Sequence, residues 1–121
     1  MRTPKNVLGE TLEACCFKPQ TGFYRDGYCK TGQGDDGVHV VCAVMTAEFL
    51  KYSAEQGNDL TTPHPEHEFP GLVSGDRWCL CVTRWRDAFD AGCAPAVILE
   101  ATHMSALEFV DLDQLRQLAM K

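Results

Sequence analysis

The stretch that decides the fold is Val38–Gly57, VHVVCAVMTAEFLKYSAEQG. Its first part, Val38–Met45, is apolar and rich in β-branched side chains, which predicts a buried strand. A helix is expected directly afterwards, because the Thr46 hydroxyl can accept hydrogen bonds from the free backbone N–H groups of a first helical turn. Gly57 suits the C′ position, at which this helix would end. The centre of the chain is therefore predicted to be a strand followed by a helix.

Residues 77–91 fit two patterns. Four large apolar side chains recur at intervals of four, three and four residues, which is typical of one helix face; they are Trp78, Val82, Trp85 and Phe89. Asp76 could cap this helix and Gly92 could end it. The segment 77–83 also shows the alternation of a strand. We predict the helix, because its apolar stripe is longer and both caps are present.

The C-terminal third is predicted to contain two further strands and a helix. Pro95 precedes an apolar strand, Ala96–Ala101, and Ala106–Val110 is expected to return as a second strand after a turn. Asp111 can cap a last helix. Strands and helices that interleave with a hairpin predict a small single α+β domain, with a short sheet and about three helices.

Two long stretches are rich in Gly and Pro, residues 18–37 and residues 58–76. Proline removes a backbone donor and fixes φ, so neither a helix nor a central strand is expected there. Two irregular segments of this length are unusual in a compact domain, and they are either functional loops or a sign of a wrong assignment. We predict two ordered loops.

Composition and charge exclude several classes of protein. The chain has 121 residues, 45% of them apolar, which fits one globular domain. Its net charge is −6, and the only basic cluster, Arg77, Arg84 and Arg86, alternates with acidic residues, so neither nucleic acid nor an anionic membrane is an expected partner. There is no apolar run long enough for a transmembrane helix, and residues 1–20 lack the apolar centre of a secretory signal. A cytoplasmic location is expected.

The seven cysteines are an odd number, and reduced thiols in a cytosol are the expected state. No C-x2-C pair of the kind common in zinc sites occurs, and a free cysteine is often a small core residue. In the predicted helix, Cys79 and Cys81 diverge and cannot share a site. His39 and Cys42, on one strand, would face opposite sides. The candidates for a metal site or a redox thiol are Cys15, Cys29, Cys42, Cys79, Cys81 and His39.

A pocket for a small molecule is the leading functional hypothesis. His103 follows an apolar strand, and strand ends with their adjoining loops are common places for functional groups. Histidine is also suited to proton transfer near neutral pH. We predict that the two long loops converge beside it, with His103 and Cys81 as the candidate catalytic groups. The candidate ligand-binding residues are Arg25, Asp26, Asn58, Asp59, Arg77 and Trp78.

Other interpretations stay open. His103 is equally well explained as a structural histidine, and Asp26, Asn58 and Asp59 as turn formers. One alternative function is a cysteine-based metal or thiol-redox site. Another is a non-catalytic interaction module, in which exposed aromatic side chains form one apolar patch; the candidates for it are Phe23, Tyr24 and Trp78. The sequence leaves the reaction, the ligand, any cofactor and the oligomeric state undetermined.

Several motifs resemble, in order, those of the small, mostly bacterial proteins grouped as domain of unknown function 2237. The resemblance extends from about residue 6 to residue 119 and implies a single-domain protein, without bringing an activity. It places five cysteines (15, 29, 42, 79 and 81) and two histidines (39 and 103) inside family motifs. It leaves Cys16, Cys93, His64 and His67 outside them. The matching stretches are Asn6–Gly9, Thr21–Gly27, His39 with Val41–Thr46, Phe49–Leu50, Gly57–Leu60, Phe69–Leu72, Gly75–Cys81, Arg84–Trp85 and Leu99–His103.

Overall fold

The predicted central strand forms β1, His39–Val44, in the computed structural model, which describes residues 4–15, 27–31, 38–63, 65 and 71–120. β1 is the middle strand of a three-stranded antiparallel sheet in the order β2-β1-β3. With three α-helices beside this sheet, the predicted α+β class is confirmed. The other elements are α1 (Ala47–Glu55), β2 (Arg77–Cys81), α2 (Val82–Asp90), β3 (Ala96–Val97), the 3-10 helices η2 (Leu99–Ala101) and η3 (Met104–Glu108), and α3 (Leu112–Gln117).

The helix boundaries follow from local hydrogen bonds that the sequence predicts. Thr46 Oγ1 accepts a hydrogen bond from the backbone N–H of Phe49 at 3.1 Å, so Thr46 is the N-cap of α1. Gly57, directly after the C-cap of α1, has a φ of +90°, which a side chain would strain. At α3, Asp111 is the predicted N-cap, and Gln114 completes a reciprocal capping box with it.

The prediction of one helix from residue 77 onward is wrong. Residues 77–81 form β2, which pairs with β1 from Val44↔Arg77 to His39↔Cys81. The helix α2 begins only at Val82 and ends, as predicted, just before Gly92. Cross-strand pairing and the burial of Trp78 outweigh the helical spacing of the aromatic residues, because strand preference depends on the tertiary partner.

Asp76 is also not a helix cap. Its carboxylate accepts a hydrogen bond from the backbone N–H of Val73 at 3.0 Å, which stabilises the turn before β2. The backbone carbonyl of Asp76 accepts a second hydrogen bond, from the N–H of Met45, at the end of β1. Asp76 therefore stabilises a turn through its side chain and precedes a strand rather than a helix.

The two strands predicted near the C-terminus need correction. Of Ala96–Ala101, only Ala96–Val97 pair with β1, and the chain then turns into η2. Ala106–Val110 is not a strand, because residues 104–108 form η3. His103 Nδ1 accepts a hydrogen bond from the Ser105 N–H at 3.0 Å, and this local cap favours the short helix over an extended strand.

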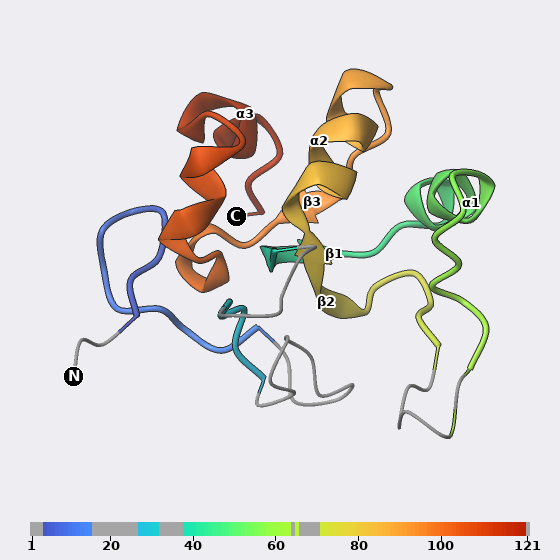
Figure 1. Cartoon of the computed structure of the whole chain (residues 1–121), viewed down its shortest axis with the longest axis horizontal. Helices are drawn as coiled ribbons and strands as arrows, with labels where there is room; N and C mark the ends of the chain where they lie inside the picture. The colour runs from blue at the N-terminus through green and yellow to red at the C-terminus, as the bar shows by residue number, and fades with distance from the viewer. Residues whose placement is uncertain (1–3, 16–26, 32–37, 64, 66–70, 121) are drawn as a thin grey trace.

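The sheet has two different faces. Cross-strand partners share a face, so Val41, Ala43, Trp78 and Leu80 lie together against the main core, and Cys42 and Cys79 lie on the other face. In Figure 1, α2 and α3 lie on one side of β1, while residues 27–31 lie on the other. The largest fully buried side chains of the main core include Trp85, Phe49, Met45 and Leu115.

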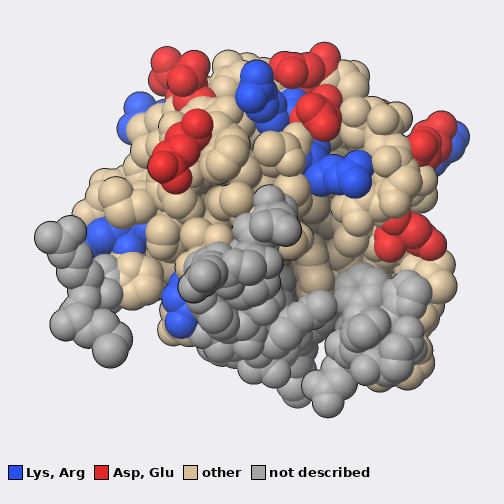
Figure 2. All heavy atoms as spheres, in the orientation of Figure 1, with Lys and Arg blue, Asp and Glu red and all other residues tan. Residues whose placement is uncertain are grey.

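The surface of the described residues carries charges of both signs. Lys and Arg side chains lie among Asp and Glu side chains over the upper part of the face in Figure 2. Within the described residues, no helix combines the length and the apolar character needed to cross a membrane. Most of the first predicted Gly- and Pro-rich loop, 18–37, lies outside the described residues, whereas most of the second, 58–76, is described apart from 64 and 66–70.

Candidate functional site: a buried four-cysteine cluster

Four cysteines from separate parts of the chain meet on the second face of the sheet. Cys42 lies on β1 and Cys79 on β2, where they are direct cross-strand partners. Cys15 comes from the N-terminal segment, and Cys29 from the short described stretch 27–31. None of the four residues is more than 2% exposed. Together with Ala101 they form a hydrophobic cluster separate from the main core, and Ile98 packs against it.

The cysteines are joined in two disulfides, neither of which links the two strands directly. Cys42 is bonded to Cys15, with an S–S distance of 2.17 Å and a Cα–Cα distance of 5.6 Å. Cys79 is bonded to Cys29, with distances of 1.96 Å and 5.2 Å. Both Cα separations lie in the range that a disulfide spans. Each strand of the β1–β2 pair is therefore tied to a different segment on the cysteine face.

The two disulfides adjoin and make one sulfur cluster. The sulfur atoms of Cys15, Cys29 and Cys79 all lie within 4.8 Å of one another, and Cys42 Sγ is bonded to the first of them. The expectation of reduced, unpaired thiols therefore differs from the structure for these four cysteines. All four are candidates of the alternative hypothesis of a cysteine-based metal or thiol-redox site, which stays a prediction.

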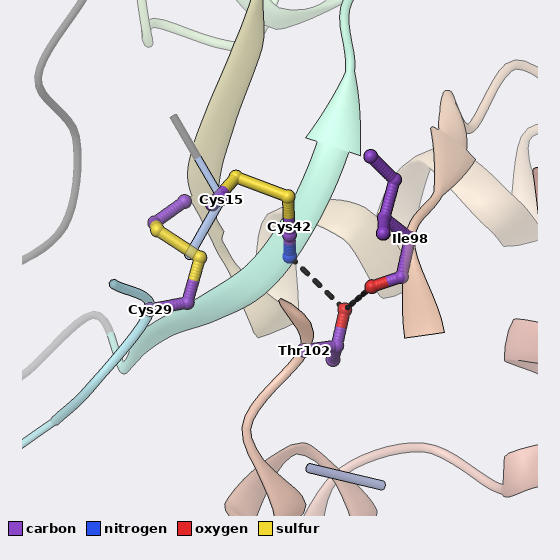
Figure 3. Close-up of a disulfide and its surroundings, with 6 residues drawn as sticks. Cys15, Cys29, Cys42, Ile98 and Thr102 are labelled. Atoms are coloured by element: carbon purple, nitrogen blue, oxygen red, sulfur yellow. Dashed lines mark hydrogen bonds between the residues drawn. A yellow bond between two sulfur atoms is a disulfide. The ribbon is translucent and has the colours of Figure 1, made fainter. Parts of the chain in front are cut away.

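Hydrogen bonds to both of its backbone polar groups hold Cys42 in place. The Cys42 N–H donates to the hydroxyl oxygen of Thr102 at 3.1 Å, and that hydroxyl donates to the Ile98 carbonyl at 2.9 Å (Figure 3). The Ile98 N–H in turn donates to the Cys42 carbonyl at 2.9 Å. Thr102 is fully buried. Because both backbone polar groups of Cys42 are paired, its side chain has a defined starting direction toward Cys15.

The segment that contains Cys15 is held against the turn that contains Thr102. The Glu13 N–H donates to the Glu100 carbonyl at 2.9 Å, and the buried amide of Asn6 donates to the same oxygen at 3.0 Å. The Cys15 N–H donates to the Gly27 carbonyl at 2.7 Å, which brings the Cys29 segment alongside. Two cysteines that are 14 positions apart in the sequence therefore reach the sheet together.

Sequence reasoning missed the residues that support this site. Thr102 and Asn6 lie in stretches that resemble the family, but residue type alone gave them no role. The available signal was that each is a small polar residue inside an otherwise apolar or tightly turned segment. Such a residue, once buried, needs hydrogen-bond partners and often fixes a neighbouring backbone.

Cys81 and His39 lie outside the sulfur cluster. They are register partners at the far end of the β1–β2 pair, past an irregularity between His39 and Val41. The Cys81 thiol is free and partly exposed, and its Sγ lies 3.2 Å from Thr83 Oγ1. Since residues 77–81 are a strand, Cys79 and Cys81 share a face about 7 Å apart, contrary to the divergence expected from a helix. Cys81 is therefore a free thiol on β2, two positions after Cys79 of the cluster.

Cys93 is a second free cysteine, and it packs against the main core. Burial raises the pKa of its thiol, and the carboxylates of Glu48 and Glu55 act in the same direction. A thiol with a raised pKa is mostly protonated at neutral pH and is a poor nucleophile. This cysteine is a suitable control for experiments on the cluster.

His103 has a structural role in the described residues. Its backbone N–H donates to the Val40 carbonyl at 3.0 Å, and its Nδ1 accepts the Ser105 N–H as the N-cap of η3. Burial lowers the pKa of His103, and the carboxylate of Glu108 opposes this shift in part. A neutral imidazole with Nδ1 as acceptor carries its proton on Nε2.

The other residues of the predicted pocket are spread over the structure. Asp59 is exposed, and hydrogen bonds from Thr62 and Thr61 hold the pKa of its carboxyl well below the usual range. Arg77 is paired with Val44, whereas His103 is bonded to Val40, so these two lie about 13 Å apart along β1.

The pocket itself stays a prediction, because Arg25 and Asp26 lie outside the described residues. Asn58 follows α1, and its carbonyl accepts the hydroxyl of Ser53 at 2.7 Å. Two surface cavities, of about 330 and 270 Å³, are lined by parts of α2, η3 and α3 and by none of the predicted pocket residues.

The proposed aromatic patch is also only partly described. Trp78 is 8% exposed and belongs to the main core, so it does not lie in an exposed patch. Phe23 and Tyr24 lie outside the described residues.

Fold and site together define a small α+β domain with four cysteines buried on one face of a three-stranded sheet. The chain belongs to the family described as "Uncharacterized protein conserved in bacteria (DUF2237)", whose model matches residues 5–119. This match confirms the resemblance carried by the sequence motifs. A comparison with curated proteins finds no match.

Proposed function

We propose that the protein is a cytoplasmic redox-responsive domain, in which the four-cysteine cluster passes between two disulfides and four thiols. The observation that carries this proposal is the convergence of four buried sulfur atoms from four separate segments of the chain. Filling a small core does not by itself explain why all four adjoining positions are cysteine. Disulfides in a reducing compartment are usually transient and serve in sensing or catalysis.

The cytoplasmic location is supported by the thiols that stay unpaired. Cys81 and Cys93 are both free in a structure whose other described cysteines are paired. Exported proteins generally pair their cysteines, and a free thiol beside disulfides invites exchange. A mixture of paired and free cysteines therefore fits a compartment in which disulfides form and break.

The two disulfides have a large effect on the stability expected for the folded state. They join cysteines that are 27 and 50 positions apart, which corresponds to about 3.5 and about 4 kcal/mol in the loop-closure model. The two closed loops overlap between residues 29 and 42, so the second bond adds less than it would alone. Total stabilities of domains are about 5–15 kcal/mol, so reduction changes a substantial part of the whole.

Burial of the sulfur atoms favours a slow change of state over rapid catalysis. Disulfide exchange requires a thiolate to approach one sulfur in line with the bond. With all four cysteines at most 2% exposed, an external thiol reaches them only after local opening. Full reduction takes four electrons and four protons, supplied by two dithiols that each become a disulfide.

The test is a redox titration of the purified full chain, followed by alkylation and peptide mass analysis. We expect Cys15, Cys29, Cys42 and Cys79 to change together from protected to alkylated as the buffer becomes more reducing. When the chain is unfolded before alkylation, Cys81 should be alkylated in every buffer, so it serves as the internal control. Four cysteines that stay alkylated across the whole range of buffers would overturn the proposal, and so would equal thermal midpoints for the oxidised and reduced protein.

A further inference from the structure

We propose that the reduced cluster is a metal site, in which Cys15, Cys29, Cys42 and Cys79 bind one soft divalent cation of the Zn²⁺ type. This inference rests on the proposed function, because only the reduced state offers four free sulfur atoms. Three of the sulfur atoms lie within 4.8 Å of one another, and the fourth is bonded to one of these three. Four tetrahedral ligands at a Zn–S distance of about 2.3 Å have S–S separations of about 3.8 Å.

The backbone already provides the spacing that such a site needs. Breaking the two S–S bonds requires each sulfur pair to separate from about 2 Å to about 3.8 Å. Rotation about the side-chain torsions of the cysteines can supply this change while the Cα atoms stay 5.6 and 5.2 Å apart. Cys42 has a fixed backbone position, because Thr102 and Ile98 bond both of its backbone polar groups.

The donor set selects the class of metal. The group of ligands found among the described residues consists of thiols alone, with no carboxylate or imidazole in it. Thiolate ligands favour zinc and other soft ions and disfavour Mg²⁺ and Ca²⁺, which require oxygen. His39 belongs to the opposite end of the strand pair and is not a member of this group.

Metal binding by thiols depends on pH and on the ion. A thiol binds a metal ion as the thiolate, so each of the four buried cysteines must lose its proton on binding, which costs free energy. A divalent cation offsets this cost and releases one proton from each ligand that it binds. Affinity for the ion should therefore fall as the pH falls.

Oxidation would release the ion. The four thiolates and Zn²⁺ carry a net charge of −2, and each of two hydrogen peroxide molecules takes two electrons from one pair of thiolates. With four protons, the products are two disulfides, four water molecules and free Zn²⁺. The structure with Cys15–Cys42 and Cys29–Cys79 bonded is then the metal-free oxidised form. Peroxide sensing of this kind connects metal content to the redox state of the chain.

The experiment uses the full chain, reduced without oxygen and titrated with Co²⁺ and then with Zn²⁺. We expect one Co²⁺ per chain, with thiolate-to-cobalt charge-transfer bands and the visible bands of tetrahedral cobalt, and displacement of the cobalt by Zn²⁺. Peroxide should bleach these bands at two molecules per ion. Cys42→Ser and Cys79→Ser should each lower affinity at least about a hundredfold, since changes beyond the ligands alone cost 10–100-fold.

Matched variants separate ligand loss from failure to fold. Cys81→Ser and Cys93→Ser remove one thiol each outside the cluster, and both should keep wild-type cobalt spectra. If the reduced wild-type chain gives no tetrahedral thiolate bands, the metal site is overturned. That result leaves the redox titration of the four cysteines unaffected, so it does not decide the proposed function. If the chain binds the metal but forms no disulfide in an oxidising buffer, the proposed function is overturned and the metal site is not.

Discussion

The two faces of the sheet are built on different principles. The face toward α2 and α3 packs large apolar side chains such as Trp85 and Leu115, and its stability comes from burial. The opposite face has a small cluster of four cysteines and Ala101, and its stability depends on covalent bonds between distant segments. The stability of the apolar face should therefore not change with redox conditions, whereas the stability of the cysteine face should depend on them.

Trp85→Ala should have the largest effect, and the same effect in both redox states. Trp85 is fully buried, and its Nε1–H donates to the Pro95 carbonyl at 3.1 Å. The centroids of the Trp85 and Phe89 rings are 5.3 Å apart. The expected loss of stability is about 3–5 kcal/mol, measured by denaturant unfolding with and without reductant. Trp85→Phe, which keeps most of the volume, is the control. A cost that differs between the two redox states by more than about 0.5 kcal/mol would show that the faces are coupled.

Loss of one disulfide should matter only under oxidising conditions. The double change Cys29→Ala/Cys79→Ala removes the longer of the two closed loops, and about 2–4 kcal/mol of stability should be lost. In a reducing buffer with a metal chelator, most of this difference should disappear. Unfolding curves in the two buffers provide the measurement, and Cys93→Ala is the matched control. An equal loss in both buffers would mean that the cluster acts through packing alone.

Thr102→Val should weaken the cysteine face without touching a sulfur atom. The change leaves the buried N–H of Cys42 without its acceptor, which costs about 1–3 kcal/mol. Faster hydrogen exchange at the Cys42 amide, together with denaturant unfolding, would locate the effect. Thr102→Ser keeps the hydroxyl and should retain most of the stability. A Thr102→Val protein with wild-type exchange at Cys42 would remove this residue from the support of the site.

The smallest expected effect is a pH dependence at His103. Burial lowers the pKa of His103 in the folded state below the unfolded value of 6.5, so the unfolded chain binds the proton more readily. The contribution of His103 to stability is therefore complete above pH 6.5 and is lost as the pH falls below that value. His103→Asn keeps an acceptor for the Ser105 N–H and should flatten the stability profile in this range. An unchanged slope in the variant would assign the pH dependence to other groups.

Much of the fold could be predicted from local chemistry. Thr46, Gly57 and Asp111 mark helix ends because their caps act within a few residues. The strand at 77–81 could not be distinguished from a helix, because its alternating pattern is favoured over the helical one only when it pairs with β1. The short helix η3 replaced a predicted strand for the opposite reason, since a local cap at His103 competes with sheet formation.

The site could be predicted only in part. Cys15, Cys29, Cys42 and Cys79 were each candidates, but their spacing in the sequence contains no local pair of ligands. Their grouping depends on the register that sets Cys42 opposite Cys79, and on two segments that cross the sheet from elsewhere in the chain. Thr102 was missed because a buried threonine shows its role only through the backbone that it bonds.

Mapping the disulfides of the oxidised chain tests the central claim most directly. Protein digested without reduction, with free thiols blocked beforehand, is analysed by mass spectrometry for linked peptides. The account predicts the pairs Cys15–Cys42 and Cys29–Cys79, with Cys81 and Cys93 blocked. A dominant link between Cys79 and Cys81, or the absence of any link at the four cysteines, would contradict it.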